Sequence, residues 1–411
     1  YAFEFIAARE RKRGALAEHD GISIKLSALY PRYEDAHRQA VLDELVPRVW
    51  TLCEAAAAAN INLTIDAEEV DRLELSLEVL EALLVQVAAH CPQWAGLGLA
   101  MQAYQTRALE LIEHITLLAR KYKIKLMCRL VKGAYWDAEV KRAQELGLPH
   151  YPVFTHKHHT DISYLACARA LLDASDVIYP QFATHNAATI AAIQQMASKA
   201  GTPFEFQRLH GMGEGVYREV LKNPLVSCRV YAPVGAHRDL LAYLVRRLLE
   251  NGANSSFVHQ LADESVGMDE LLISPLRLEP QPSLPLPADL YGAKRANSLG
   301  LDLAVASMRE PLLAAGLKPV LPQDTAWAEL AAHFSLKPGT RQIFDIAVES
   351  VQTSCGWGVP MMELQHERDT LQKYHRQADR TLWVEKFKER NKSIDGLPTR
   401  PTDRFIEGET A

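Results

Sequence analysis

The sequence predicts an α/β protein whose main part is a (β/α)8 barrel of the TIM type, followed by a small C-terminal appendage. Two observations support this fold class. Short apolar or β-branched segments alternate with long amphipathic segments over roughly the first 260 residues, as in parallel strands joined by helices. Polar residues also follow nearly every short segment. A closed barrel gathers the carboxyl ends of its strands at one rim, whereas a doubly wound sheet binds ligands at one crevice, so this distribution favours the barrel.

Seven strands are recognisable as short apolar runs, at Ile22–Leu26, Leu63–Ala67, Leu97–Gln102, Lys125–Val131, Val177–Ala183, Phe204–Leu209 and Ser227–Tyr231. The segment Tyr1–Ile6 is the expected eighth strand, with a weaker pattern. Helices are predicted between strands at Val41–Asn60, Leu75–His90, Arg107–Tyr122 and Ala187–Lys199. Apolar residues recur at helical spacing from Ala108 to Leu118, so one face of that helix is expected to be buried.

The composition is that of a globular protein without a nucleic-acid surface. The 411 residues are 48% hydrophobic and 23% charged, and the formal net charge is −6. Such an acidic balance gives no electrostatic footprint for nucleic acid. No apolar run reaches the ~18 residues of a membrane-spanning helix. The six cysteines show neither a C-x-x-C pair nor metal spacing, which indicates a reducing, cytoplasmic compartment.

Composition divides the chain into three predicted parts. Residues 1–262 carry the barrel pattern. Residues 263–326 are expected to form a linker, because five prolines fall within Leu272–Pro287. Residues 327–411 form the appendage, which contains new turn signals at Pro338-Gly339 and around Pro398.

Two motifs at strand ends are candidates for a binding site. The first, Asp66-Ala67-Glu68-Glu69, is on spacing alone more often a helix N-cap than a site. The second, Arg129–Asp137, places two cations before small residues and two aromatic residues. This order suits a flat anionic ligand, because small residues let the backbone approach and aromatic rings stack on it. A basic strand end followed by an ordinary turn explains the second motif equally well.

A third candidate is a pair of arginines on the predicted helix that contains residues 243–250. Arg246 and Arg247 lie four and three residues before Glu250, so a helix brings the three side chains together. Two guanidinium groups can bind a carboxylate, with Glu250 holding one of them. On spacing alone, a solvated surface ion pair is the more frequent outcome.

Histidines provide weaker candidates. A lone histidine such as His185, at a strand end, is more often structural than catalytic. No metal site is assigned to His156, His158 and His159, because carboxylates or cysteines at set spacing are lacking. The sequence also lacks a Gly-x-Gly-x-x-Gly motif after a strand, a Walker loop and a Gly-x-Ser-x-Gly elbow.

Taken together, the motifs resemble one family, the proline dehydrogenase domain of proline utilization A. The segments that carry this resemblance are Gly21–Tyr33, Ile65–Glu69, Arg129–Asp137, Phe182–Asn186, Phe206–Glu214, Tyr231–Gly235 and Tyr243–Asn254. The resemblance implies a (β/α)8 barrel that binds FAD non-covalently. It also implies oxidation of L-proline to 1-pyrroline-5-carboxylate by hydride transfer to flavin N5, the first step of proline catabolism.

The resemblance also assigns roles to individual residues. Lys25, Arg246 and Arg247 would bind the proline carboxylate, and Glu250 would orient the arginines. The walls around the pyrrolidine ring would be Asp66, Tyr135, Leu209 and Tyr231. FAD would be bound by Gln102, Arg129, Val131, Gly133, Ala134, Trp136, Thr155, Lys157, His185, Asn186 and Gln207.

Two further expectations follow from this family. Electrons would pass to a membrane quinone or another acceptor, with peripheral contact at the inner face of the membrane. In the family, a first strand and a long helix precede the segment that matches Gly21, whereas about twenty residues precede it here. We therefore expect a defective first strand, and an inactive remnant is the first alternative to an active enzyme.

The C-terminal part carries a different resemblance. Asp289–Asp302 resembles the linker that leads into the aldehyde dehydrogenase half of bifunctional relatives. Gly339–Phe344, Ser350–Pro360 and Asn391–Pro398 resemble the end of pyridoxamine 5′-phosphate oxidase-like flavin proteins. This implies a partial flavin split barrel, fused to the first domain, for which we expect no activity of its own. The second alternative is that residues 327–411 act as an FMN- or deazaflavin-binding module.

Overall fold

The computed structural model describes residues 2–10, 16–236, 238, 240–252, 260, 263, 265–278, 284–295, 297, 299–315, 324–336, 343, 373 and 376. The chain forms two compact units, residues 1–309 and residues 310–411. The segments that resemble pyridoxamine 5′-phosphate oxidase-like proteins lie outside the described residues, apart from the single residue Ile343, so that resemblance stays a prediction.

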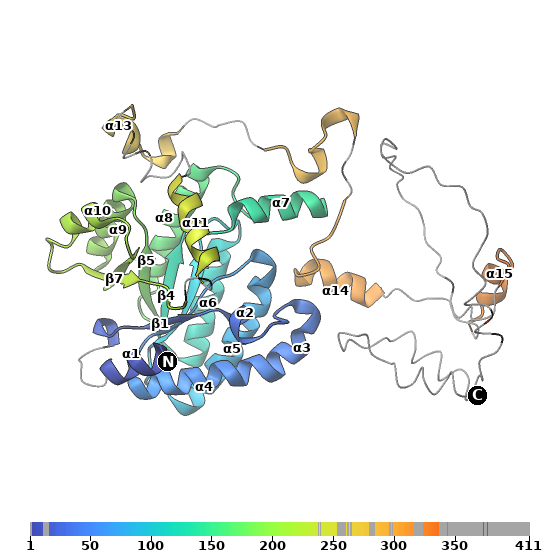
Figure 1. The fold of residues 1–411 in the computed structure, drawn as a ribbon, viewed down its shortest axis with the longest axis horizontal. Coiled ribbons are helices and arrows are strands. Elements are labelled where there is room, and N and C mark those ends of the chain that lie inside the picture. Colours follow the sequence, from blue (N-terminus) through green and yellow to red (C-terminus); the bar gives the residue numbers. More distant parts are fainter. Residues whose placement is uncertain are drawn as a thin grey trace. The chain divides into compact units, whose positions relative to one another are not determined.

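The first unit is built on one parallel sheet of seven strands in sequential order (Figure 1). The strands are β1 (Ile22–Ile24), β2 (Leu63–Ile65), β3 (Leu97–Gln102), β4 (Leu126–Val131), β5 (Ile178–Ala183), β6 (Glu205–Leu209) and β7 (Ser227–Tyr231). Each strand is parallel to its neighbour. All seven predicted strands are therefore confirmed, within two residues at each end.

Helices connect these strands and pack on one another in chain order, so that α4 contacts α5, α5 contacts α6, α6 contacts α8 and α8 contacts α9. A short π-helix, Val41–Leu45, leads into α4. The α-helices are α1 (Ala2–Glu10), α2 (Leu26–Leu29), α3 (Arg38–Ala40), α4 (Val46–Ala59), α5 (Leu73–His90), α6 (Ala108–Tyr122), α7 (Trp136–Leu146), α8 (Lys157–Asp173), α9 (Ala187–Ala200), α10 (Glu214–Val220), α11 (Leu241–Gly252), α13 (Met268–Leu271), α14 (Ala306–Ala315) and α15 (Trp327–Ala331).

The prediction of an eighth strand at Tyr1–Ile6 is wrong. Residues 2–10 form α1, most of whose residues are good helix formers, namely Ala2, Glu4, Ala7, Ala8, Arg9 and Glu10. The side chains of Phe3 and Ile6 are three residues apart, on one face of a helix, and both pack against the core. A closed eight-stranded barrel is not confirmed, because no described strand joins β7 to β1 and the sheet is a curled half-barrel.

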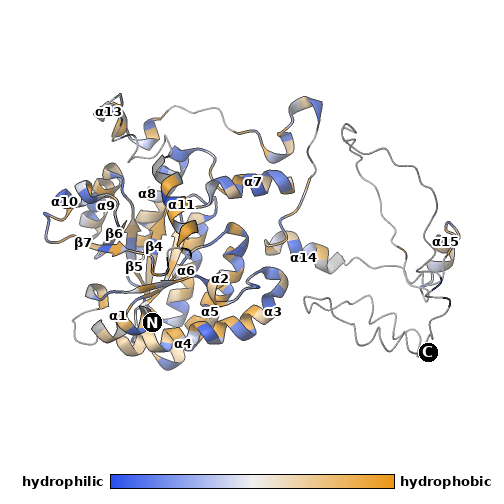
Figure 2. Ribbon diagram, viewed as in Figure 1, coloured by the Kyte–Doolittle hydropathy of each residue, from blue (hydrophilic) through white to orange (hydrophobic). Residues whose placement is uncertain are grey.

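The core lies between the sheet and the helices around it. All six residues of β3 are buried, as expected for a parallel strand covered on both faces. The predicted apolar face of α6 is buried as well, including Leu111, Ile112 and Ile115. Figure 2 shows this pattern as apolar strands within helices whose other faces are hydrophilic.

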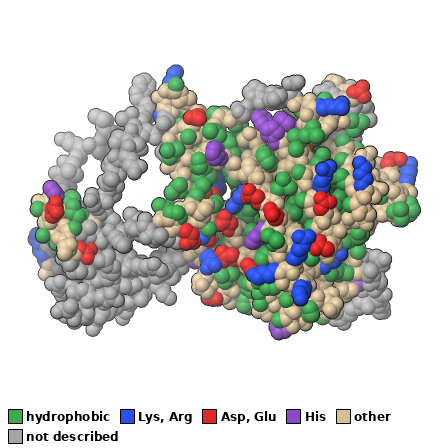
Figure 3. Space-filling model, turned by 180° about the vertical axis from the view of Figure 1, so that it is seen from behind, with side chains coloured by type: hydrophobic (Ala, Val, Ile, Leu, Met, Phe, Trp, Pro, Cys, Tyr) green, Lys and Arg blue, Asp and Glu red, His purple; other side chains and the backbone are tan. Residues whose placement is uncertain are grey.

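Charged side chains are interspersed on the surface shown in Figure 3. Many are paired between neighbouring helices, such as Lys121 of α6 with Glu81 of α5 at 2.8 Å. Exposed pairs of this kind contribute little to stability individually. Among the described helices, none combines the length and apolarity that crossing a bilayer requires.

Residues 284–295, 297 and 299–309, which we call the post-barrel segment, are bonded at several points to the helices of the first unit. Both Nη atoms of Arg142 on α7 donate to Asp302, at 2.8 and 2.9 Å. The backbone N–H of Gly300 donates to the carbonyl oxygen of Gly147 at 3.0 Å, and that of Ala306 donates to Glu74 on α5 at 2.8 Å. Part of the stretch predicted as a linker is therefore bonded to the helices around the sheet.

We predict that Gly300→Ala lowers the stability of the first unit. A Cβ atom at Gly300 would lie 1.8 Å from the carbonyl oxygen of Leu146, so one of the two segments must shift. Overpacking of this kind costs about 1–3 kcal/mol, and the midpoint of urea unfolding should fall accordingly. The control is Gly215→Ala, because a Cβ atom there meets nothing within 4 Å. Equal midpoints for the two variants would contradict the close packing of the post-barrel segment.

Candidate active site

Arg129 lies at the centre of the interior of the half-barrel, near the carboxyl end of β4. Its side chain is only 9% exposed. Three of its nitrogens donate hydrogen bonds of 2.7 Å: Nε to Gln207, Nη1 to Asp66 and Nη2 to Ser23. These partners come from β6, from the end of β2 and from β1. One guanidinium therefore connects side chains from four of the seven strands.

Asp66 and Tyr231 complete this group. The Tyr231 hydroxyl donates to Oδ2 of Asp66 at 3.1 Å, while Oδ1 accepts from Arg129. The Arg129 guanidinium also lies 5.1 Å from the centroid of the Tyr231 ring. Burial and the charge of Asp66 raise the pKa of Tyr231, so the phenol stays protonated and acts as a donor.

Tyr135 lies between two further cations. Nζ of Lys25 donates to the Tyr135 hydroxyl at 3.0 Å, and the Arg246 guanidinium lies 5.7 Å from the centroid of the same ring. Burial lowers the pKa of Lys25, but the hydrogen bond to Tyr135 and the charges of Tyr135, Asp66 and Glu68 outweigh it. The net shift of the Lys25 pKa is upward. Lys25 therefore carries a positive charge beside Arg246.

Arg247, the other arginine of α11, faces a second aromatic group. Its guanidinium lies 5.2 Å from the centroid of the Tyr243 ring, which stacks on Tyr231 with centroids 6.5 Å apart. Arg247 is also close enough to His185 to affect its ionisation. Since the side chain of Glu250 lies outside the described part of the chain, its predicted role in orienting the arginines stays a prediction.

His185 connects this group to Leu209. Its Nε2 accepts a hydrogen bond of 3.1 Å from the backbone N–H of Leu209, which is consistent with a neutral ring. Burial, followed by the charges of Arg247 and Arg208, lowers the pKa of His185 to about 4. Gly213 makes room for this ring, because a Cβ atom there would lie 2.7 Å from Cδ2 of His185.

The loop after β4 passes close to an aromatic ring. Gly133 has a φ of 144°, and a Cβ atom there would lie 2.5 Å from the Tyr104 ring. This position therefore requires glycine. The neighbouring Ala134 is exposed. Trp136 begins α7, donates from Nε1 to the carbonyl oxygen of Phe154 at 2.8 Å, and is still 38% exposed.

The remaining predicted cofactor residues lie at the carboxyl ends of β3 and β4 and at the starts of α8 and α9. Val131 is the register partner of Gln102, whose side chain accepts from Gln105 at 2.7 Å. Lys157 donates to Asp161 at 3.0 Å and begins α8, two residues after the half-buried Thr155. The side chain of Asn186 caps α9 by accepting from the backbone N–H of Thr189 at 2.9 Å.

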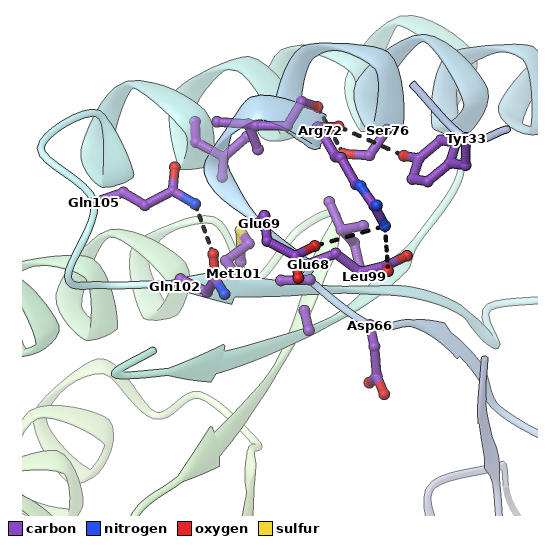
Figure 4. Close-up of a pocket in the computed structure, with 14 residues that line it drawn as sticks. Tyr33, Asp66, Glu68, Glu69, Arg72, Ser76, Leu99, Met101, Gln102 and Gln105 are labelled. Atoms are coloured by element: carbon purple, nitrogen blue, oxygen red, sulfur yellow. Dashed lines mark hydrogen bonds and ion pairs between the residues drawn. The ribbon is translucent and has the colours of Figure 1, made fainter. Parts of the chain in front are cut away.

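A small pocket lies beside this site rather than within it. Its lining includes Asp66 and Gln102 together with Glu68, Glu69 and Arg72. Arg72 donates to Glu68 at 3.0 Å, whereas Figure 4 shows Asp66 pointing away from this pair. Asp66 therefore turns its carboxylate toward Arg129, in the interior of the sheet, and not into the pocket.

Four contributors to this site were missed from the sequence, namely Ser23, Tyr243, Glu205 and Arg229. Glu205 and Gln207 are two residues apart on β6, so their side chains lie on the same face of the sheet. Arg229 is the register partner of Gln207 on β7. Alternation along β6 could have revealed Glu205, but the register that brings Arg229 to it could not be read from the sequence.

The fold and the site together define a barrel-type α/β protein with a polar site at the carboxyl ends of its strands. A family model described as proline dehydrogenase matches residues 2–260. The bifunctional protein PutA of Klebsiella aerogenes is 48% identical over 360 residues, which cover 80% of this chain and 27% of that protein. PutA of Rhizobium meliloti is 50% identical over 323 residues, 74% of this chain and 26% of that protein.

Solved structures agree with these matches. A mutant of Bradyrhizobium japonicum proline utilization A superposes with a TM-score of 0.73 at 50% identity, covering 80% of this chain and 35% of that chain. Proline utilization A from Bdellovibrio bacteriovorus, inactivated by N-propargylglycine, gives 0.68 at 30% identity, covering 82% and 36%. The chain therefore belongs to the proline dehydrogenase family, as its motifs predicted. It spans about a quarter of the length of these two PutA proteins, since it covers 27% and 26% of them.

We predict that His185 stays neutral as the pH falls from 6.5 toward 4. Because its pKa is about 4 in the folded state and 6.5 for an unperturbed histidine, the unfolded chain takes up a proton in this window and the folded chain does not. His185 therefore contributes stability that is fully present above pH 6.5 and is lost as the pH falls to about 4. NMR titration should show its imidazole still neutral at pH 5.

The matched comparison uses His185→Gln. Its NMR spectrum lacks the His185 signal and thereby identifies it, and its free energy of unfolding should fall less than that of the wild type between pH 6.5 and 4. The exposed His114→Gln serves as the control and should leave the His185 signal in place. If the ring of His185 titrates near pH 6.5, the buried, cation-flanked setting described here is wrong.

Proposed function

We propose that this chain catalyses the FAD-dependent oxidation of L-proline to 1-pyrroline-5-carboxylate, the first step of proline catabolism. One observation carries the proposal: Lys25, Tyr135 and Arg246 come together from distant parts of the chain, beside the Arg129 group. Membership in the proline dehydrogenase family supports it. So does a related solved structure, that of proline utilization A with proline bound in remote sites, which is 49% identical to this chain.

The cations at this site suit an amino-acid carboxylate. Of the predicted site residues whose side chains are described, the cationic ones are Lys25, Arg129, Lys157, Arg246 and Arg247, and Asp66 is the carboxylate among them. Arg129 is bonded to Asp66, and Lys157 is bonded to Asp161. Lys25 and Arg246 lie beside the Tyr135 ring, and Arg247 follows Arg246 on α11, so these three cations would bind a substrate anion there. Binding by two guanidinium groups and an ammonium group fixes the carboxylate and thereby orients the ring attached to it.

The walls of the site suit a small, partly apolar ring. Tyr135 and Tyr231 offer aromatic faces, and Leu209 offers an aliphatic side chain held by the bond from its backbone to His185. The Tyr135 ring is fixed between Lys25 and Arg246, while the Tyr231 ring is fixed between Arg129 and Tyr243. These residues would hold the pyrrolidine ring of proline without moving far.

The residues after β4 fit a flavin. Ala134 and Trp136 are exposed, and the indole of Trp136 offers a flat surface for stacking, while Gly133 lets the loop pass close to the Tyr104 ring. FAD, when bound, accepts the hydride that leaves the carbon beside the ring nitrogen of proline. Arg129 is buried, and its fixed positive charge would favour negative charge that develops near it.

We further propose that the electrons pass to a quinone or another acceptor, through reversible peripheral contact with the inner face of a membrane. The support for this step is the resemblance of residues 21–257 to proline utilization A. The acceptor could be identified by testing soluble quinone analogues against ferricyanide as oxidants.

The proposal is tested by adding L-proline anaerobically to the full chain loaded with FAD. We expect the flavin absorbance to bleach, because the bound flavin is reduced. Pyrrolidine has the same ring without the carboxylate, so it should leave the absorbance unchanged at the same concentration. A flavin-loaded protein that proline does not bleach would refute the proposed activity.

We predict that Arg246→Met raises the KM for proline at least tenfold, which corresponds to about 1.4 kcal/mol of lost binding energy. The substitution keeps most of the side-chain length but removes the charge next to Tyr135 and Lys25. Steady-state kinetics with a soluble acceptor would measure this effect. Arg218→Met, at an exposed position on α10, is the matched control and should keep the KM within twofold of the wild type. An unchanged KM in Arg246→Met would remove the carboxylate-binding role.

A further inference from the structure

A second buried ion pair lies deeper in the half-barrel than the Arg129 group. Glu205 on β6 is 1% exposed and accepts two hydrogen bonds from Arg229 on β7. Nε of Arg229 donates to Oε1 at 2.9 Å, and Nη2 donates to Oε2 at 3.0 Å. A buried pair of this geometry is no evidence of net stabilisation, because desolvation offsets the attraction. The other hydrogen bonds of Glu205 and Arg229 indicate that the pair positions neighbouring side chains.

Glu205 also organises two amide side chains on the inner face of the sheet. Its Oε1 accepts from Nε2 of Gln181 at 3.0 Å and from Nε2 of Gln207 at 2.8 Å. Gln181 and Gln207 are both buried. Gln207 in turn accepts the bond of 2.7 Å from Nε of Arg129. A continuous chain of hydrogen bonds therefore runs from Arg229 through Glu205 and Gln207 to Arg129.

The chemistry of this chain fixes the orientation of the Gln207 amide. An ionised carboxylate only accepts hydrogen bonds, and a guanidinium only donates them. The amide of Gln207 must therefore turn its NH₂ group toward Glu205 and its carbonyl oxygen toward Arg129. Rotating the amide by half a turn would oppose donor to donor and acceptor to acceptor. Glu205 and Arg129 thus fix the orientation of the Gln207 amide from its two sides.

Arg229 also connects the two open edges of the half-barrel. While Nε and Nη2 bind Glu205, Nη1 donates to the carbonyl oxygen of His19, and Nη2 also lies 3.3 Å from that of Ala17. Residues 17 and 19 directly precede β1, and Arg229 lies on β7. The same guanidinium therefore holds β7 next to the segment that leads into β1, where no described strand lies between them.

We propose that Glu205 and Arg229 are positioning residues for the site, which fix Gln207 and, through it, the guanidinium of Arg129. This inference rests on the proposed function, because it concerns how Gln207 and Arg129 meet the flavin. Neither Glu205 nor Arg229 is bonded to Lys25, Tyr135 or Arg246 in the described interactions. The pair acts on the flavin side of the site and leaves the carboxylate-binding side alone.

The test is Glu205→Gln in the full chain, a substitution that keeps the shape and removes the acceptor-only group. We expect the dissociation constant of FAD, measured by fluorescence titration of the apoprotein, to rise about tenfold and the flavin absorption bands to shift. The KM for proline should stay within twofold of the wild type. Asp176→Asn is the matched control, because it removes the exposed partner of Arg120 and should change neither quantity.

Two results would overturn the inference. One is a folded Glu205→Gln variant whose FAD affinity and flavin spectrum equal those of the wild type, whatever its thermal stability. If that variant does not fold, the double variant Glu205→Met with Arg229→Met is measured instead, because it leaves no unpaired buried charge. The second overturning result is an FAD affinity of this double variant that equals the wild-type affinity. A wild-type chain that binds FAD but is not bleached by proline would instead refute the proposed function, so the two failures are distinguishable.

Discussion

The buried guanidinium of Arg129 is the group on which the site depends. A charge in the interior is tolerated only when it is paired and hydrogen-bonded, and Arg129 meets this condition through Asp66, Gln207 and Ser23. Because these partners come from different strands, the bonds require the sheet to curl. Tyr231 then bonds to the free oxygen of Asp66 from the last strand. The same contacts therefore shape the half-barrel and assemble its polar interior.

Around this group the fold places two different sets of side chains, one cationic and one flat and exposed. Lys25 and the α11 arginines lie near Tyr135 and Tyr243, where a carboxylate would be bound. The loop after β4 offers the exposed Ala134 and the flat, exposed indole of Trp136. Parallel strands make this separation possible, because every strand delivers its carboxyl end to the same edge of the sheet.

Local patterns were enough to predict most of the fold, whereas long-range pairing was not. The seven strands were predictable because buried parallel strands are short apolar runs between helices. The N-terminal helix was missed, because six residues are too few to distinguish alternation from helical spacing. The roles of the site residues were inferred from motifs that match one family as ordered segments, and those roles stay predictions. Glu205 and Arg229 could not be predicted, because they meet through the register of β6 and β7. The role of Glu250 stays a prediction, because its side chain lies outside the described part of the chain.

The central claim, that one buried cation joins the strands, is tested most directly by a double-mutant cycle on Arg129 and Asp66. The free energy of unfolding would be measured for the wild type, Arg129→Met, Asp66→Asn and the double variant. Since each single variant leaves a buried polar partner unpaired, we expect the double variant to be less destabilised than the sum, by at least about 1 kcal/mol. Strictly additive effects would contradict the account, because the two side chains would then not interact.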